Sequence, residues 1–387
     1  MCIKKIIAFT GIRSDYDLMS LIYKEMNIRS TFKIGLIVSG AHLSETYGYT
    51  INQIEADEIP IIAKIENLID SNSKSSRITS LSILLNNCIH DVTRFDPDAI
   101  IVAGDREEVI VGALIGAYLN IPVIHFFGGD HAADGNVDNR IRHATSKLSN
   151  IHFVSNDQAK TRLLRMGEED FRIFNLGSPS LDKFESTRYI KKEDILKNMG
   201  KEKFGKYAIL VFHPILGEEK NSANYFEQII YCLKNKSIKT FISYPNVDSG
   251  NKDIIGIIDK YKNDEMFCFY KNLDRDVFIN LLRNCEFVIG NSSLGIYEAP
   301  LIKKGAINVG NRQKDRLSCE NVIFVDQKIE SIEKAIDEVR SLKFKNKLKN
   351  IKSLYGDGHS VKKIVDCIEN IDFNKFIKKS NDVLNMR

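Results

Sequence analysis

The chain has 387 residues, of which 43% are hydrophobic and 27% are charged, a balance typical of a globular protein with about two domains. The formal net charge of +4 is too small to indicate a nucleic-acid partner. No apolar stretch approaches the roughly 20 residues of a membrane span, and no signal peptide precedes the first apolar run, so we expect no membrane partner and a cytoplasmic location. The seven cysteines lack C-x-x-C spacing and are predicted to be reduced.

Short runs rich in β-branched residues alternate with helical patterns along nearly the whole chain, as in parallel sheets covered by helices. The predicted strands of the first half are Lys5–Phe9, Lys33–Val38, Ala99–Val102, Pro122–Phe126 and Ile151–Val154. Those of the second half are Ala208–Phe212, Thr240–Tyr244, Met266–Tyr270, Phe287–Ile289, Ala306–Val309 and Val322–Val325. We therefore predict an α/β fold of two Rossmann-like domains, joined near residues 183–190, with the active site in the cleft between them.

Polar residues follow the first predicted strands, where ligands bind in such sheets. Gly11 and Arg13 follow the first strand, but neither G-x-G-x-x-G nor a P-loop sequence is present, which disfavours a dinucleotide redox cofactor and a P-loop NTPase. His42 follows the second strand, and a lone loop histidine is more often structural than ligand-binding. Asp105, beside Arg106, follows the next strand, where it suits proton transfer or ligand contact, or only caps a helix.

The densest polar cluster is the segment from His125 to His143. It contains three aspartates, three histidines and two arginines within nineteen residues, which packing alone does not explain. On a helix Asp138 and Arg142 share one face, so a carboxylate and a guanidinium can be presented together. A metal site is the rival interpretation, but the H-x-x-x-H and H-E-x-x-H spacings are absent.

A strand-turn-helix joint in the second half suits an anionic ligand. The segment Gly290–Pro300 follows a buried apolar run, and Asn291 or Ser292 can cap the helix that begins there. Free backbone N–H groups and the helix dipole then favour a phosphate. Glu298, one turn further along, suits the cis-diol of a ribose, so the segment fits a nucleoside diphosphate. The alternative is an ordinary capped helix with a solvated Glu298.

Two further strands of the second half are predicted to end in polar residues. Phe212-His213-Pro214 ends one of them, and Tyr244-Pro245-Asn246 ends the next. His213 would face the first domain across the cleft, a place that suits a general base or a phosphate contact.

Together these segments resemble the hydrolysing UDP-N-acetylglucosamine 2-epimerases, including those of sialic and legionaminic acid synthesis. The resemblance implies the GT-B fold, with Rossmann-like domains at residues 1–184 and 185–368 and a helix within 369–387 that packs back on the first domain. The matching motifs are Thr10–Tyr16, Ser39–Leu43, Gly104–Arg106, Asp138 with Arg142–Ala144, Phe212–Pro214, Tyr244–Asn246, Asn291–Pro300 and Gly310–Gln313.

The resemblance also implies roles for individual residues. Ser292, Ser293, Glu298 and Arg312 would hold UDP, while Arg13 and Phe278 would sandwich the uracil ring. Asp105, Asp138 and His213 match catalytic or sugar-site positions, and we place His42, Arg106, Arg142 and Asn246 around the sugar. A carboxylate or imidazole would remove the C2 proton as UDP leaves, and hydration of the glycal would then give the free, C2-inverted sugar. This scheme needs no cofactor or metal, and we expect a homo-oligomer, either a dimer or a tetramer.

The chain departs from the family pattern at one position. Where the family has His-x-Glu-Gly-Gly, this chain has Phe127 in place of the glutamate. Either Asp130, Asp134 or His131 takes over, of which we assign Asp130 to catalysis, or the substrate is different. An apolar ring suits a 6-deoxy sugar, which makes UDP-2,4-diacetamido-2,4,6-trideoxyglucose an alternative to UDP-GlcNAc, and a guanine or thymine nucleotide stays open.

Two other functions also stay open at this point. A retaining GT-B glycosyltransferase would keep the nucleotide half of the site but would need an acceptor groove. A non-catalytic nucleotide-sugar sensor would keep Ser292, Glu298 and Arg312 while losing the acids, and Phe127 is the observation in its favour.

Overall fold

The computed structural model describes residues 3–69, 74–131, 137–215, 217–245, 250–271 and 273–379. Contacts divide the chain into two units. Unit 1 comprises the residues up to Lys183 together with those from Gly358 onward, and unit 2 is Phe184–Asp357. The chain thus returns to unit 1 earlier than the predicted limit of residue 368, because helix α15 (Ser360–Asn370) contributes Ile364, Val365 and Ile368 to the core of unit 1.

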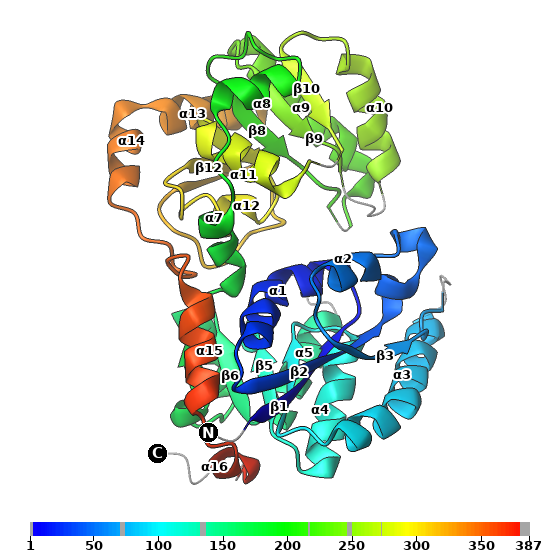
Figure 1. The fold of residues 1–387 in the computed structure, drawn as a ribbon. Coiled ribbons are helices and arrows are strands. Elements are labelled where there is room, and N and C mark those ends of the chain that lie inside the picture. The colour runs from blue at the N-terminus through cyan, green and yellow to red at the C-terminus, as the bar shows by residue number, and fades with distance from the viewer. Residues whose placement is uncertain are drawn as a thin grey trace. The chain divides into compact units, whose positions relative to one another are not determined.

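The sheet of unit 1 has seven parallel strands in the order β3-β2-β1-β4-β5-β6-β7 (Figure 1). Five strands were predicted, whereas β3 and β7 were not, because these edge strands are largely half-exposed and lack a continuous apolar run. The strands are β1 (Lys4–Thr10), β2 (Phe32–Ser39), β3 (Ile61–Ile65), β4 (Ala99–Ala103), β5 (Val123–Phe126), β6 (Ile151–Val154) and β7 (Ile173–Asn175).

Helices cover both faces of this sheet, since alternate residues of β1 enter different cores. Ile6 and Ala8 pack with residues of α1, α2 and α15, whereas Ile7 and Phe9 pack with residues of α3 and α4. The helices of unit 1 are α1 (Arg13–Ile28), α2 (Ile51–Ala56), α3 (Lys74–Phe95), α4 (Glu107–Leu119), α5 (Val137–Leu148), α6 (Asp157–Arg165), α15 and α16 (Asn374–Ile377), with short 3-10 turns at Gly40–Leu43, Glu45–Tyr47, Asp170–Arg172 and Pro179–Asp182.

Unit 2 repeats this architecture with six parallel strands in the order β10-β9-β8-β11-β12-β13. Ala208 and Leu210 of β8 face one core, and Ile209 and Val211 face the other. The strands are β8 (Ala208–Val211), β9 (Thr240–Ser243), β10 (Phe267–Tyr270), β11 (Phe287–Gly290), β12 (Gly305–Val309) and β13 (Val322–Val325). The helices are α8 (Lys192–Asn198), α9 (Glu219–Asn235), α10 (Asn251–Tyr261), α11 (Arg275–Asn284), α12 (Leu294–Tyr297), α13 (Ile329–Arg340) and α14 (Leu342–Lys349), and α7 (Lys183–Ser186) lies at the boundary of the units. No helix in the described part of the chain has the length and apolar character needed to cross a membrane.

The passage of the chain back into unit 1 is fixed by Asp182. Its carboxylate accepts hydrogen bonds from the backbone N–H groups of Ser360 (2.9 Å) and Val361 (2.6 Å), which are otherwise unpaired at the start of α15. At the other end of α15, the Lys4 ammonium donates to the carbonyls of Ile368 (2.9 Å) and Glu369 (2.8 Å). Helix α15 is therefore tied to the first strand of unit 1.

The strand order reverses between β1 and β4 in unit 1 and between β8 and β11 in unit 2. In open parallel sheets, ligands bind beyond the carboxyl ends of strands at such a switch point. The turns found there contain Gly11 and Asp105 in unit 1, and His213 and Asn291 in unit 2. The topology therefore marks the same turns as the sequence motifs do.

Gly290 generates a prediction about stability. Its φ is +132°, and an added Cβ would lie 2.0 Å from the carbonyl oxygen of Val211 on the neighbouring strand. We expect Gly290→Ala to lower the free energy of unfolding by about 2 kcal/mol or more in urea titrations, because backbone must move. Gly256→Ala in α10 is the matched control, since its Cβ would meet no atom within 4 Å and alanine favours a helix. Equal losses in the two variants would contradict this account.

Candidate active site

The joint after β11 is built around Asn291, which is fully buried. Its side chain accepts a hydrogen bond from the backbone N–H of His213 and donates one to the carbonyl of His213, each at 2.8 Å. The two turns at the switch point of unit 2 are thereby held in register. The N-cap of the following helix is Ser293, and the Oγ of the preceding Ser292 accepts from the N–H of Leu294 at 3.3 Å.

The helix after this joint is a single turn. α12 has only four residues, and Glu298 is the residue that ends it. A single turn provides little helix dipole, so phosphate binding at this joint depends on backbone N–H groups, hydroxyls and a cation. Arg312 can supply that cation, since its Nη1 donates to the carbonyl of Asn291 at 3.2 Å, beside Ser292 and Ser293.

Glu298 has a carboxyl group enclosed by protein. Burial raises its pKa to about 7, against an opposing effect of the positive charge of Arg275, and its Oε2 is buried with no hydrogen-bond partner among the described residues. An enclosed acceptor of this kind is costly to leave unpaired, and a ligand hydroxyl is one group that could pair with it. The predicted contact of Glu298 with a ribose diol stays a prediction that this environment supports.

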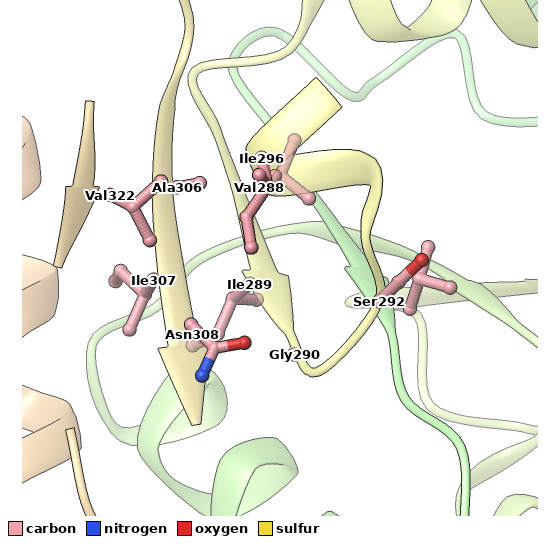
Figure 2. A pocket seen from close by; sticks show the side chains of 11 residues that line it. Val288, Ile289, Gly290, Ser292, Ile296, Ala306, Ile307, Asn308 and Val322 are labelled. Atoms are coloured by element: carbon pink, nitrogen blue, oxygen red, sulfur yellow. The ribbon is translucent and has the colours of Figure 1, made fainter. Parts of the chain in front are cut away.

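A small pocket with an empty volume of about 250 Å³ lies under α12, between β11 and β12 (Figure 2). Figure 2 shows aliphatic side chains such as Ile289 and Ile307 lining it, with Ser292 and Asn308 as its polar side chains. Asn308 is itself occupied, because it donates to the carbonyl of Gly310 at 2.9 Å. We assign this pocket to packing and not to nucleotide binding, which needs several polar partners.

Phe278 and Arg13, predicted to sandwich the uracil ring, lie in different units. Phe278 is half-buried on α11, with its ring centroid 6.5 Å from that of Tyr270. Arg13 is exposed at the first position of α1. The sandwich itself stays a prediction.

In unit 1, the turns after β4 and β5 meet α5 in a network of carboxylates and guanidinium groups. Arg142 of α5 forms an ion pair with Asp105, which follows β4. Asp138, in the first turn of α5, lies 4.0 Å from Arg77 of α3, and Arg77 also pairs with Glu107. Two of the three predicted catalytic aspartates, Asp105 and Asp138, are thus held by neighbouring ion-pair networks that share helix α5.

Asp130 and Phe127 lie in the turn that follows β5. Phe127 adopts a left-handed backbone with φ of +62°, which is rare for a bulky residue, and its ring packs against the core of unit 1. Asp130 is half-buried, and one of its carboxylate oxygens accepts from the Nδ2 of Asn156 at 3.4 Å. The turn therefore directs Phe127 toward the core and provides a carboxylate three residues later.

Two histidines of the predicted motifs are structural in their contacts. His42 is fully buried between the hydroxyls of Thr10 (3.0 Å) and Thr50 (2.8 Å), and burial lowers its pKa to about 4. Both ring nitrogens are occupied, so in this structure His42 orders the turns after β1 and β2 and presents no nitrogen to the sugar. His125 is also buried, and it links Ser146 of α5 to the carbonyl of Gly104.

A second, larger pocket lies at the carboxyl ends of β1 to β4, with an empty volume of about 740 Å³. Arg106 lines it, as predicted for a residue near the sugar, together with Asn67 and Arg77. Sequence reasoning missed Glu108 in this pocket, whose carboxyl pKa is raised by burial. Gly11 is the sequence feature connected with this burial. A Cβ at Gly11 would lie 2.0 Å from the Oε1 of Glu108, so the absence of a side chain there leaves room for the carboxyl group.

Two residues of the predicted site, Asp134 and Asn246, lie outside the described residues. His131 is exposed and stacks on His143, with ring centroids 5.9 Å apart. Within the described ranges, no group of three His, Cys, Asp or Glu side chains could hold a metal ion.

Comparison with known proteins assigns the fold and the motifs to a family. The sequence model of the UDP-N-acetylglucosamine 2-epimerase family matches residues 24–369. The chain belongs to this family. It is 32% identical over 375 residues to the UDP-N,N'-diacetylbacillosamine 2-epimerase (hydrolyzing) of Legionella pneumophila, with 97% of this chain and 98% of the relative covered.

A second relative and a solved structure are also similar to this chain. The UDP-N-acetylglucosamine 2-epimerase of Neisseria meningitidis is 33% identical over 343 residues, with 88% of each chain covered. A crystal structure of UDP-GlcNAc 2-epimerase from the same organism, bound to UDP-GlcNAc, matches with a TM-score of 0.77 at 19% identity, covering 94% of this chain and 99% of that chain. This structural likeness confirms the predicted fold class of two Rossmann-like units, the GT-B class.

The enclosed carboxyl of Glu298 predicts a pH effect. Its pKa is 4.5 in the unfolded chain and about 7 in the folded protein, so the folded state holds the proton more tightly and stability falls as pH rises from 4.5 to 7. Glu298→Gln cannot ionise and should lose this dependence. We expect its unfolding midpoint in urea, relative to the unmodified protein, to be higher at pH 8 than at pH 5. If the unfolding midpoints of the two proteins differ by the same amount at pH 5 and at pH 8, the pKa of this carboxyl does not change on folding.

Proposed function

We propose that this protein is a hydrolysing 2-epimerase of a UDP-2-acetamido sugar, which releases UDP and the free sugar inverted at C2. The observation that carries the proposal is the set of three carboxylates at Asp105, Asp130 and Asp138, which unit 1 places around the ends of β4 and β5 and the start of α5. Two proton transfers at one carbon need at least two such groups, and one alone would not suffice.

In this proposal, unit 2 binds the nucleotide part of the substrate. Ser292, Ser293 and Arg312 bind the diphosphate and stabilise the charge that develops on UDP as it leaves, and Glu298 accepts from the ribose. His213, which is held against Asn291, contacts the phosphate or acts as an acid in this step. Support comes from the structure of a family member bound to UDP-GlcNAc.

Asp130 takes the place of the family glutamate in this proposal. Phe127 packs on the core of unit 1, so its ring needs no contact with a substrate to account for its presence. Asp130 lies at the end of the same turn and is hydrogen-bonded by a buried asparagine, which fixes the carboxylate. Asp105 and Asp138 supply the remaining carboxylates, and Arg106 and Arg142 contact the sugar.

The preferred substrate in this proposal is the UDP-linked 2,4-diacetamido-2,4,6-trideoxy sugar. Relatives in Legionella pneumophila and Campylobacter jejuni whose names specify diacetylbacillosamine match over 97% of this chain. A relative named for UDP-N-acetylglucosamine is equally similar over 88% of the chain, so UDP-GlcNAc is the competing substrate. A role in sialic or legionaminic acid synthesis, a cytoplasmic location and a dimeric or tetrameric assembly belong to the same proposal.

Turnover in D₂O tests the reaction itself. Incubation with each UDP-sugar should release UDP and a free C2-epimer that carries deuterium at C2, as followed by proton NMR. We expect kcat/KM to be higher for the diacetamido sugar, because the two relatives whose names specify diacetylbacillosamine match over 97% of this chain. Sugar transfer without exchange at C2 would identify a glycosyltransferase. Binding of the UDP-sugar without turnover would identify a sensor. A preference for UDP-GlcNAc would overturn the deoxy-sugar assignment.

The assignment of Asp130 generates a separate prediction. We expect Asp130→Asn to lower kcat about 100-fold or more while UDP affinity, measured by calorimetry, stays within twofold, because a positioned proton-transfer group is lost. Phe127→Leu should be nearly silent. Asp170→Asn is the matched control, since Asp170 is an exposed aspartate paired with Lys160 on the surface. Normal turnover by Asp130→Asn would move the chemistry to Asp105, Asp138 or His213.

A further inference from the structure

Lys379, which follows α16, contacts the carboxyl end of α5. The Lys379 ammonium donates to the carbonyls of Ser146 (3.1 Å), Lys147 (2.9 Å) and Ser149 (2.7 Å), which are among the carbonyls left without a partner at the end of α5. A cation at a helix carboxyl end also stabilises the helix dipole. Lys379 therefore caps the helix that carries Asp138 and Arg142.

The same ammonium is held by a fully buried carboxylate. Glu168, whose side chain is completely inaccessible, lies 2.6 Å from the Nζ of Lys379, 2.9 Å from that of Lys147 and 3.0 Å from the Nε2 of His152. Breaking a buried ion pair by removing one partner costs far more than a surface pair, because the other charge stays buried. The position of Lys379 is thus strongly determined.

Backbone contacts anchor the segment that precedes this lysine. The guanidinium of Arg172, which is 2% exposed, donates to the carbonyls of Phe376 (3.0 Å) and Lys378 (2.5 Å). Asn150 donates to the same carbonyl of Phe376 at 2.9 Å. The segment is therefore a built part of unit 1 and not a loose tail.

Ser146 connects Lys379 to the turn that carries Asp105. While the Ser146 carbonyl accepts from Lys379, its hydroxyl lies 3.1 Å from the Nδ1 of His125, and the Nε2 of His125 lies 3.0 Å from the carbonyl of Gly104. Gly104 directly precedes Asp105, and Asp105 pairs with Arg142 one turn back on α5. Polar contacts thus run without interruption from Lys379 to the catalytic turn.

We propose that Lys379 is a positioning residue, whose ammonium, clamped between Glu168 and the end of α5, holds the carboxylates of Asp105 and Asp138 in their working arrangement. This inference rests on the proposed function for its effect on turnover. Its effect on α5 is independent of any substrate.

The charge of Lys379 gives the proposal a pH signature. Burial lowers the pKa of Lys379 to about 8, against the opposing effect of Glu168, and the other charged or titratable groups around it are Lys147, Arg172, His152 and His125. Above pH 8 the ammonium loses its proton and with it part of its contacts, so kcat should fall on the alkaline side. An arginine at this position would stay charged, and the alkaline fall should move to higher pH.

The experiment compares Lys379→Met with Lys378→Met, in which the neighbouring exposed lysine is altered. We expect Lys379→Met to lower kcat at least tenfold with KM and UDP affinity within twofold, and Lys378→Met to behave as the unmodified protein. Lys379→Arg should recover most of kcat and shift the alkaline limb upward. If Lys379→Met folds poorly, the double variant Lys379→Met with Glu168→Gln removes the stranded charge and is expected to keep the same loss in kcat.

Hydrogen exchange of α5 separates this inference from the proposed function. Amides of residues 143–149 should exchange at least tenfold faster in Lys379→Met than in Lys378→Met, whatever substrate the protein uses. Any one of three results would overturn the positioning role. The first is equal hydrogen exchange in Lys379→Met and Lys378→Met, and the second is equal kcat in these two variants. The third is a fall of kcat at alkaline pH that Lys379→Arg does not shift. Absence of turnover by the unmodified protein, with the difference in exchange intact, would overturn the proposed function alone.

Discussion

The parallel direction of every strand is the constraint on which the rest of this protein depends. Because all strands of a sheet end at the same edge, the turns after β1, β2, β4 and β5 are brought together although they are far apart in the sequence. Buried apolar strands thus decide where polar chemistry can gather. The Asp105–Arg142 ion pair and the hydrogen bond between Asn156 and Asp130 are local consequences of that edge.

Most of the sheet could be predicted from the sequence, and the reason is burial. Strands such as β6 and β11 are enclosed on both faces and read as continuous apolar runs. β3 and β7 lie at the sheet edges, where half-exposed residues carry no such pattern. The length of α12 was not predicted, because a cap and a helix start give no information on where the helix ends.

The candidate site was predictable in position but not in its pairings. The spacing of Asp138 and Arg142 indicates a shared helix face, yet Arg142 pairs with Asp105 on another turn, a contact that only tertiary structure specifies. Glu108 reads as a solvated acid in the first turn of a helix, and its burial depends on the missing side chain of Gly11. His42 reads as a possible ligand contact, but two threonine hydroxyls already occupy its ring.

The contact between helix α15 and the first strand of unit 1 has a consequence for biosynthesis. Unit 2 is one continuous stretch of chain, whereas unit 1 needs α15, which the ribosome delivers only after all of unit 2. Lys4 and Asp182 therefore have no partners on α15 until unit 2 has been synthesised and can form its own core. During that interval the faces of α1 and β1 that α15 will cover are open to solvent. Nascent chains of this protein thus carry an exposed apolar surface at their amino-terminal end until α15 has been synthesised.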